Sequence, residues 1–211
     1  MPLEAQSALR GTRRGRRAGH GDTRLAILKA ASSEFLSRGY DSTSMRGIAK
    51  VAGVDPALVH HYFASKADLF AETISAPVRP DRIVREVLAG PRELIGVNLV
   101  RAALTNLDKP SAQKQFIGLL RTALSHDFAA TILRQFMTRE VVGKLSKYLD
   151  VPDGDFRATA AASQLVGLFV IRYGVKFEPL AKISVEDAAL HFGPIIQWHL
   201  TGSNDPIDME R

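Results

Sequence analysis

Hydroxyl, basic and aromatic side chains gather between residues 43 and 66. Hydroxyl, guanidinium and ammonium groups donate hydrogen bonds to phosphate oxygens, and arginine also reaches the edges of bases. The members of this set are Thr43, Ser44, Arg46, His60, His61, Tyr62 and Lys66, and the small residues Pro56 and Ala57 lie among them. They can contact a polyanion if the local helices present them on one outer face.

A metal site is the alternative chemistry for the adjacent residues His60 and His61. Neighbouring positions on a helix diverge by about 100°, and no third ligand lies at metal spacing. The chain has no cysteine, which excludes disulfides, thiolate metal sites and cysteine nucleophiles. We therefore expect neither a metal nor a cofactor.

Four short helices are predicted within residues 22–76. Asp22 or Thr23 can cap a first helix that Gly39 ends. The second covers 45–52 and Gly53 allows the reversal after it. The third is predicted over 56–63, since Asp55-Pro56 is an N-cap followed by the residue suited to the first helical position. Ser65-Lys66-Ala67-Asp68 has the form of a capping box and opens the fourth.

The second and third helices have the form of a helix-turn-helix, although ordinary helical packing gives the same pattern. We expect Leu58, Val59 and Phe63 to face the core. Pro56, Ala57, His60 and His61 would then face the major groove. Tyr62, Lys66, Thr43 and Ser44 would bind backbone phosphates. Lys66 is the strongest phosphate candidate, because a lysine is poorly placed at the N-terminus of its own helix.

These residues carry a resemblance to a known family. The run from Thr43 to Val54, then Tyr62-Phe63 and Ser65-Lys66-Ala67-Asp68-Leu69-Phe70, resembles the DNA-binding domain of the tetracycline-repressor (TetR) family over about residues 22–75. The resemblance implies an all-helical dimeric repressor whose C-terminal domain binds a small ligand and releases DNA. Arg46 resembles a position that reaches a base, and a phosphate contact is an equal alternative. Ala57 and His60 depart from the residues usual in the family, which leaves the operator sequence open.

The net charge of +6 lies entirely in the first third of the chain, because residues 67–211 hold equal numbers of acidic and basic side chains. Residues 1–21 are rich in arginine and glycine and are expected to form a disordered arm. Its arginines Arg13, Arg14, Arg16 and Arg17 could enter a narrow minor groove. A solvated tail with only non-specific attraction to DNA is equally compatible with the composition.

Helical patterns also fill the rest of the chain, over about 81–89, 91–107, 111–124, 126–149, 155–176 and 184–200. No segment alternates as a strand does. The predicted fold is therefore all-α, with a helix-turn-helix domain over 22–76, a helical ligand-binding and dimerisation domain over 81–202, and a tail over 203–211.

Two surfaces of this larger domain are candidates for function. Small and apolar residues on the last two helices are predicted to form a two-fold interface, namely Ala158, Ala161, Ala162, Leu165, Phe169, Ile195 and Trp198. Burial of this helix within one subunit is the alternative. A ligand cavity is predicted to be lined by Phe116, Leu120, Phe128, Phe136 and Met137, although such residues more often form simple core.

The sequence thus predicts a sequence-specific DNA-binding transcriptional regulator, in the form of a ligand-responsive repressor. Its expected partners are double-stranded DNA with a near-palindromic operator, a second copy of the chain and a small-molecule effector. A helical ligand-binding or adaptor protein without specific DNA binding is the alternative. No catalytic motif supports an enzyme. No apolar run approaches the roughly 20 residues of a membrane span, and we expect a cytoplasmic protein.

Overall fold

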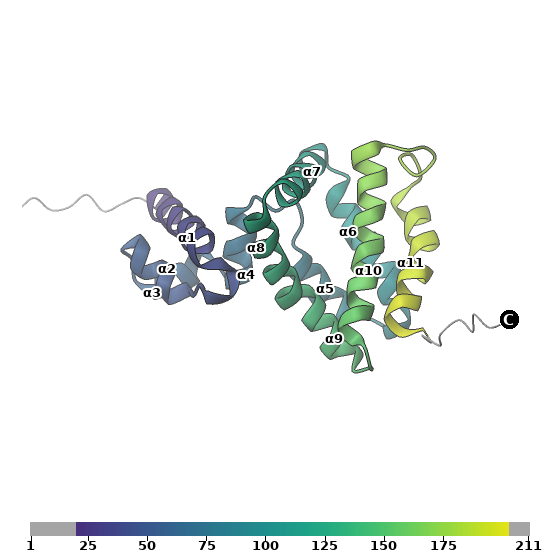
Figure 1. Cartoon of the computed structure of the whole chain (residues 1–211), viewed down its shortest axis with the longest axis horizontal. Coiled ribbons are helices and arrows are strands. Elements are labelled where there is room, and N and C mark those ends of the chain that lie inside the picture. Colours follow the sequence, from purple (N-terminus) through teal and green to yellow (C-terminus); the bar gives the residue numbers. More distant parts are fainter. Residues whose placement is uncertain (1–19, 203–211) are drawn as a thin grey trace, which may run out of the picture.

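The computed structural model describes residues 20–202, which form helices joined by turns and loops and contain no strand. The helices lie in two groups along an elongated molecule (Figure 1). Their bounds are α1 His20–Ser42, α2 Met45–Ala52, α3 Pro56–Tyr62, α4 Lys66–Thr73, α5 Pro80–Leu88, η1 Arg92–Leu94, α6 Ile95–Leu107, α7 Pro110–Ser125, α8 Asp127–Met137, η2 Thr138–Val142, α9 Gly143–Leu149, α10 Gly154–Phe169, η3 Val170–Val175 and α11 Val185–Thr201. The predicted all-α fold is confirmed.

The first group comprises α1 to α4 around one hydrophobic core. Ile48 and Ala49 of α2, Val59 of α3 and Phe63 just after it are all fully buried. They pack with α1 residues such as Phe35, which forms an edge contact with Phe70 of α4 at 4.9 Å between ring centroids. Because these side chains come from four short helices, tertiary packing and not helix propensity holds the group together.

The first helix differs slightly from its prediction. It begins at His20, so that Asp22 lies in its first turn and does not cap it. Gly39 breaks the helix as predicted, with a positive φ of 78°. A β-carbon at Gly39 would also lie 2.8 Å from the Gln135 side chain of α8, so both backbone and space require glycine there.

The second group, α5 to α11, encloses the larger hydrophobic core. Helices α6 and α11 cross at Gly96 and Gly193, where no β-carbon fits. A β-carbon on Gly96 would lie 2.2 Å from the Gly193 carbonyl oxygen, and one on Gly193 would lie 2.5 Å from the Val97 side chain. Gln197 strengthens this crossing by accepting a hydrogen bond from the Gly96 N–H at 2.9 Å.

Helix α8 joins the two groups. Its residues Ile132 and Phe136 are buried in the core of α1 to α4, although they lie in the middle of the larger domain in sequence. Phe136 contacts Tyr40 and Phe70, with ring centroids 5.4 and 4.9 Å apart. The two predicted domains therefore share side chains where they meet.

The helix formed by α10 and η3, Gly154–Val175, is long and apolar enough by length and composition to span a membrane, with a mean hydropathy of 1.3. The sequence predicted no apolar run near the length of a membrane span. The difference arises because the apolar residues of this helix are interspersed with small ones and do not form one continuous run. The helix packs against α9 and α11. Its buried Arg172 donates hydrogen bonds to the carbonyl oxygens of Leu180 and Ile183. The inner face of this helix thus packs within the protein, and 33% of its most apolar stretch is buried.

Candidate nucleic-acid interface

Caps at both ends of α2 and at the start of α3 fix the turn between these helices. The Ser44 side chain accepts a hydrogen bond from the Gly47 N–H at 3.0 Å and caps α2. Gly53 adopts a left-handed conformation with φ of 68°, and its N–H donates back to α2. Asp55 then caps α3 by accepting from the Ala57 N–H at 2.7 Å. This predicted helix-turn-helix is present, with rigid caps that set the direction of α3.

The outer face of α3 is exposed. Pro56, Ala57, His60 and His61 all lie on it, as predicted. Leu58 was expected in the core, but the structure leaves it 39% exposed. The prediction was wrong: Val59 and Phe63 are fully buried, whereas Leu58 is an exposed apolar side chain of α3.

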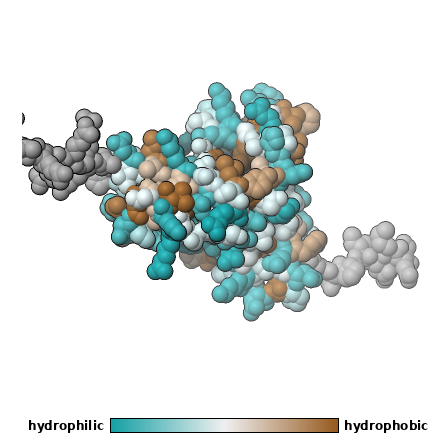
Figure 2. Space-filling model, turned by 60° about the vertical axis from the view of Figure 1, so that its left-hand side comes forward, coloured by the Kyte–Doolittle hydropathy of each residue, from teal (hydrophilic) through white to brown (hydrophobic). Residues whose placement is uncertain are grey.

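Figure 2 turns this end of the molecule toward the viewer and shows hydrophilic side chains spread over it, with smaller hydrophobic patches between them. Arg46 and Lys50 of α2 are exposed, and Tyr62 is half-buried beside the His61 ring. Lys50 was not among the predicted contacts, although its position on α2 four residues after Arg46 could have pointed to it. Arg13, Arg14, Arg16 and Arg17 lie outside the described residues.

Thr43 does not have the position that the sequence analysis gave it. Its side chain is 3% exposed, and its hydroxyl lies within hydrogen-bonding distance of the carbonyl oxygens of Gly39 and Glu34, at 2.8 and 3.1 Å. A buried hydroxyl that is bonded to main-chain carbonyls holds the turn between α1 and α2 and has no free face for a phosphate. Ser44 remains exposed beside it.

Lys66 has partners within the protein. Its ammonium donates to the carbonyl oxygens of Thr43 and Asp41, at 2.9 and 3.3 Å, and lies 4.4 Å from the centre of the Tyr40 ring. Partial burial lowers the pKa of Lys66 below its ordinary value, although nearby Asp41 opposes this shift. These internal partners explain a lysine at the N-terminus of α4 without an external phosphate. The phosphate contact of Lys66 stays a prediction.

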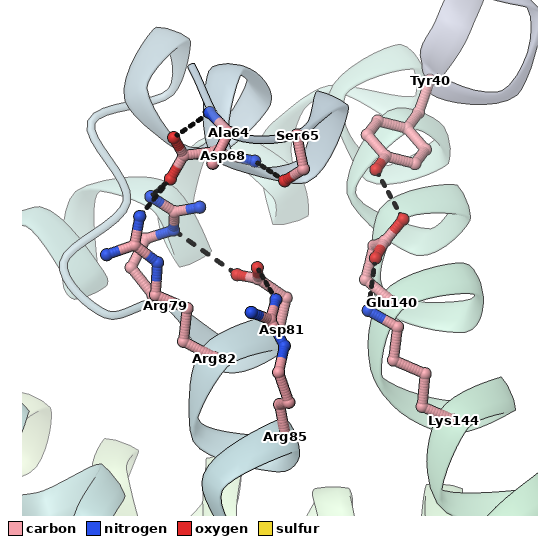
Figure 3. A network of polar contacts seen from close by, with 10 residues as sticks. All are labelled: Tyr40, Ala64, Ser65, Asp68, Arg79, Asp81, Arg82, Arg85, Glu140 and Lys144. Atoms are coloured by element: carbon pink, nitrogen blue, oxygen red, sulfur yellow. Dashed lines mark hydrogen bonds and ion pairs between the residues drawn. The ribbon is translucent and has the colours of Figure 1, made fainter. Parts of the chain in front are cut away.

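An ionic network connects the helix-turn-helix group to α5 (Figure 3). Asp68 of α4 accepts hydrogen bonds from Arg79, Arg82 and the Ala64 N–H. Asp81 of α5 pairs with Arg79 and, at 3.8 Å, with Arg85. Burial by itself would raise the pKa of Asp68, but the hydrogen bonds from Arg79, Ala64 and Arg82 outweigh it and hold the pKa below its usual value.

A second link runs from Tyr40 to α8 and η2, and Figure 3 shows its contact with Glu140 of η2. The Tyr40 hydroxyl donates to Glu140 at 2.8 Å, and its N–H donates to Gln135 at 2.9 Å. Burial and the Glu140 carboxylate raise the pKa of Tyr40 above its ordinary value. Lys144 also donates to Glu140, and together these hydrogen bonds lower the pKa of Glu140 against the effect of its burial. No single motif in the sequence pointed to this link.

The predicted dimer interface divides between two faces. Ala158, Ala161 and Phe169 are buried within the subunit, and their assignment to an outer interface is wrong because this face of α10 packs inward. Ala162 and Leu165 are partly buried and line an internal cavity. Ile195 and Trp198 of α11 are 45% and 53% exposed. Other exposed residues are Phe156, Thr159, Ser163 and Gly167 on α10, and Leu190 and Pro194 on α11.

A cavity of about 220 Å³ opens inside the larger domain. Of the predicted lining, Phe116, Leu120, Phe136 and Met137 contribute to it. Phe128 does not, because it lies at the start of α8 and is 50% exposed. The segment between α4 and α5 also lines the cavity, through residues that include Ile74 and Val78, and this was not predicted. Within residues 20–202 no group of three or more His, Cys, Asp or Glu side chains could hold a metal ion.

Comparison with known proteins matches both parts of the chain. Residues 27–73 match the family of bacterial regulatory proteins, tetR family, and residues 93–200 match the tetracyclin repressor-like C-terminal domain. The transcriptional regulator BetI of Rhizobium meliloti is 27% identical over 190 residues, which cover 86% of this chain and 91% of BetI.

Two further relatives are similar over different lengths. The transcriptional activator FasR of Mycolicibacterium smegmatis is 33% identical over 85 residues, which are 40% of this chain and 36% of FasR. A solved TetR-family regulator from Streptomyces coelicolor is 34% identical, with a TM-score of 0.46, over 88% of this chain and 98% of that one.

The matched C-terminal region covers half of the chain, and the matched N-terminal region contains the helix-turn-helix described above. This family consists of transcriptional regulators and not of enzymes. The chain therefore belongs to the tetracycline-repressor family of DNA-binding transcriptional regulators.

Proposed function

We propose that this regulator is a homodimeric repressor that releases a near-palindromic operator when a small molecule enters the cavity of the larger domain. The observation that carries the proposal is the position of Phe136. This side chain lines the cavity and also packs on Tyr40 and Phe70 in the DNA-binding core. A change in the cavity thus reaches the DNA-binding helices through one rigid ring.

The DNA contacts are proposed to come from α3 in the major groove and α2 at the backbone. Pro56, Ala57, His60 and His61 would face base edges, together with the exposed Leu58, which suits a thymine methyl group. The exposed side chains of Ser44, Arg46 and Lys50 would bind phosphates, and Tyr62 would support them from its half-buried position. The arginines of residues 1–19 would add non-specific attraction.

Dimerisation is proposed to use the exposed face of α10 and α11. Leu190, Ile195 and Trp198 give α11 an apolar stripe, and Ser163 and Gly167 give α10 a flat surface. Small side chains let helices approach closely, and apolar side chains exposed on one face are typical of an interface. A two-fold axis doubles the sequence read by a seven-residue recognition helix.

Selection of genomic fragments by the purified protein tests this function. The protein is mixed with sheared DNA of the source genome, and the retained fragments are sequenced. We expect one enriched motif with two inverted half-sites, and light scattering of the complex should count two or four chains per site. Retention without any enriched motif would instead support the alternative, a helical ligand-binding or adaptor protein. We place the regulator in the cytoplasm, with its DNA.

A further inference from the structure

The walls of the cavity that Phe136 lines are built from hydrocarbon side chains. Its walls come from the connection between α4 and α5, from helices α5 to α10 and from η2. Every residue that lines it is alanine, proline, valine, leucine, isoleucine, methionine or phenylalanine. The described lining therefore offers a ligand no charged group and no strong hydrogen-bonding side chain, and the Met137 thioether is only a weak acceptor.

This lining limits the chemistry of what can bind. An ionised ligand entering the cavity would lose its hydration and find no opposite charge, which strongly opposes binding. A ligand with several hydroxyl or amide groups would leave them unpaired for the same reason. An uncharged apolar molecule loses little in entering, and it gains contact with Phe116 and Phe169, whose rings meet edge to face at 5.6 Å.

The volume limits the size. An apolar protein cavity of about 150 Å³ holds one benzene molecule. The cavity here, about 220 Å³, holds a somewhat larger molecule, on the scale of two fused rings. A long acyl chain or a nucleotide-bearing ligand exceeds this space unless the helices move apart.

We infer that the effector is a small, uncharged lipophilic molecule of about the size of a bicyclic hydrocarbon, and that Phe136 transmits its presence to the DNA-binding helices. The inference rests on the proposed function and names the ligand class of its cavity. Phe136 is 1% exposed and packs on Tyr40 and Phe70, so a ligand that pushes its ring away from the cavity also pushes on these two rings. Ile74, in the turn that ends α4, lines the same cavity.

The chemical class is tested with three probes of one shape. Naphthalene, 2-naphthoate and 2-naphthyltrimethylammonium are titrated into the full-length protein, and binding is followed by calorimetry and by the fluorescence of Trp198. We expect saturable binding of naphthalene, with both ions weaker by at least about tenfold. Binding of either ion as tightly as naphthalene, or no binding of any probe, overturns the inference.

Variants place the binding in this cavity. Ala162→Phe fills it from α10, and Ala160→Phe, two residues earlier and outside the lining, is the matched control. We expect the first to lose naphthalene binding and the second to keep it. Leu120→Ala enlarges the cavity and should improve binding of anthracene relative to naphthalene. Circular dichroism shows whether Ala162→Phe folds. If it does not, Leu120→Ala still tests the cavity.

The transmission step has its own readout. Naphthalene should lower the affinity of the wild type for the motif retained from genomic DNA, and Phe136→Leu should bind naphthalene with a smaller effect on DNA. An equal effect in Phe136→Leu overturns the role of this ring. Failure of the ligand-free protein to select any DNA motif would instead contradict the proposed function, so the two failures are distinguishable.

Discussion

At the scale of single residues, Lys66 holds the turn before α2, beside the residues that we propose contact DNA. Its ammonium bonds to two main-chain carbonyls of the turn that precedes α2 and lies over the Tyr40 ring. The same turn contains the buried Thr43 hydroxyl. Together these polar groups hold Ser44, the cap of α2, in place. A substitution at Lys66 therefore affects the turn whether or not the ammonium also meets a phosphate.

Replacement of Lys66 by methionine separates these two roles. We expect Lys66→Met to lower the free energy of unfolding by about 1 to 2 kcal/mol, because two carbonyl oxygens lose a charged donor. If the role is structural, DNA affinity falls while the dependence of log K on log salt stays unchanged. A shallower slope, by about one unit, would show a lost phosphate contact. Lys50→Met, on the exposed surface of α2, is the control expected to flatten the slope without loss of stability.

Asp68 is the residue whose charge state joins α4 to α5. Its carboxylate accepts from Arg79, Arg82 and the Ala64 N–H, and Ser65 caps α4 beside it. The two arginines thus depend on one buried acid. Arg79 is itself largely buried, so it would lose its main partner if Asp68 were protonated.

The lowered pKa of Asp68 gives a signed dependence of stability on pH. The unfolded carboxyl takes up its proton at a higher pH than the folded one, so this stabilisation is complete above the ordinary aspartate range and is lost as pH falls through the folded pKa. We expect Asp68→Asn to unfold at least about 2 kcal/mol more easily near neutral pH and to show less acid sensitivity. Urea unfolding from pH 7 to pH 3 measures both.

Glu186→Gln is the control for Asp68→Asn. Glu186 pairs with Arg101 on the surface, which also lowers its pKa, but water screens this exposed pair. We expect little change in stability at neutral pH. An Asp68→Asn profile that parallels the wild type at every pH would contradict the role of this carboxylate.

At the scale of elements, the crossing of α6 and α11 brings two helices of the larger domain into close contact at glycine. Gly96 and Gly193 lie face to face there, and Gln197 bonds to both the Gly96 N–H and the Arg92 carbonyl oxygen. Helix α11 can present its outer residues in a defined position because its inner face is held this tightly.

Gly193→Ala is expected to disturb this crossing. Its added methyl would lie 2.7 Å from the Val97 Cα, so the helices must separate, at a cost of about 1 to 3 kcal/mol. Gly118→Ala in α7 meets nothing within 4 Å and should leave stability unchanged or raise it by up to about 1 kcal/mol through helix propensity. Thermal unfolding of both variants makes the comparison. Equal melting temperatures would show that the crossing adapts freely.

At the scale of the whole molecule, the exposed face of α10 and α11 is the surface that we propose for dimerisation. Its small residues lie on the side of α10 opposite to Ala158 and Ala161, which are buried in the subunit. A charged replacement at Ala161 would therefore unfold the domain, whereas one at the outer surface would act on association alone.

Gly167→Arg tests this surface. Gly167 is exposed and a β-carbon there meets nothing within 4 Å, so the subunit should fold as the wild type does. At the proposed seam, however, a bulky charge would block helix approach, and we expect monomers with weak operator binding. Ser111→Arg, exposed at the start of α7, is the control and should stay dimeric. Sedimentation beside a DNA titration gives the result. A dimeric Gly167→Arg protein would move the interface elsewhere.

The sequence by itself determined the helices and the helix-turn-helix, because these depend on local signals. Ser44, Gly53, Asp55 and Ser65 act as caps or turns where their side chains and backbone freedom require it, and helix α2 has the bounds that the spacing predicts. The break in α1 at Gly39 follows from the same local chemistry. Helix periodicity also found Phe116, Leu120, Phe136 and Met137 of the cavity lining, since residues that face inward repeat at fixed intervals.

Only the tertiary structure decided which inward face meets which neighbour. Periodicity marks Ala158, Ala161 and Phe169 as one apolar face of α10, but it does not say whether a second subunit or the same one covers it. The contacts of Phe136 with Tyr40 and Phe70, and those of Lys66 with the turn before α2, also join residues far apart in sequence. Tyr40 and Glu140 are a hundred residues apart in sequence, and they meet because α8 packs against both groups of helices. Such contacts depend on the summed packing of both cores, which no local signal encodes.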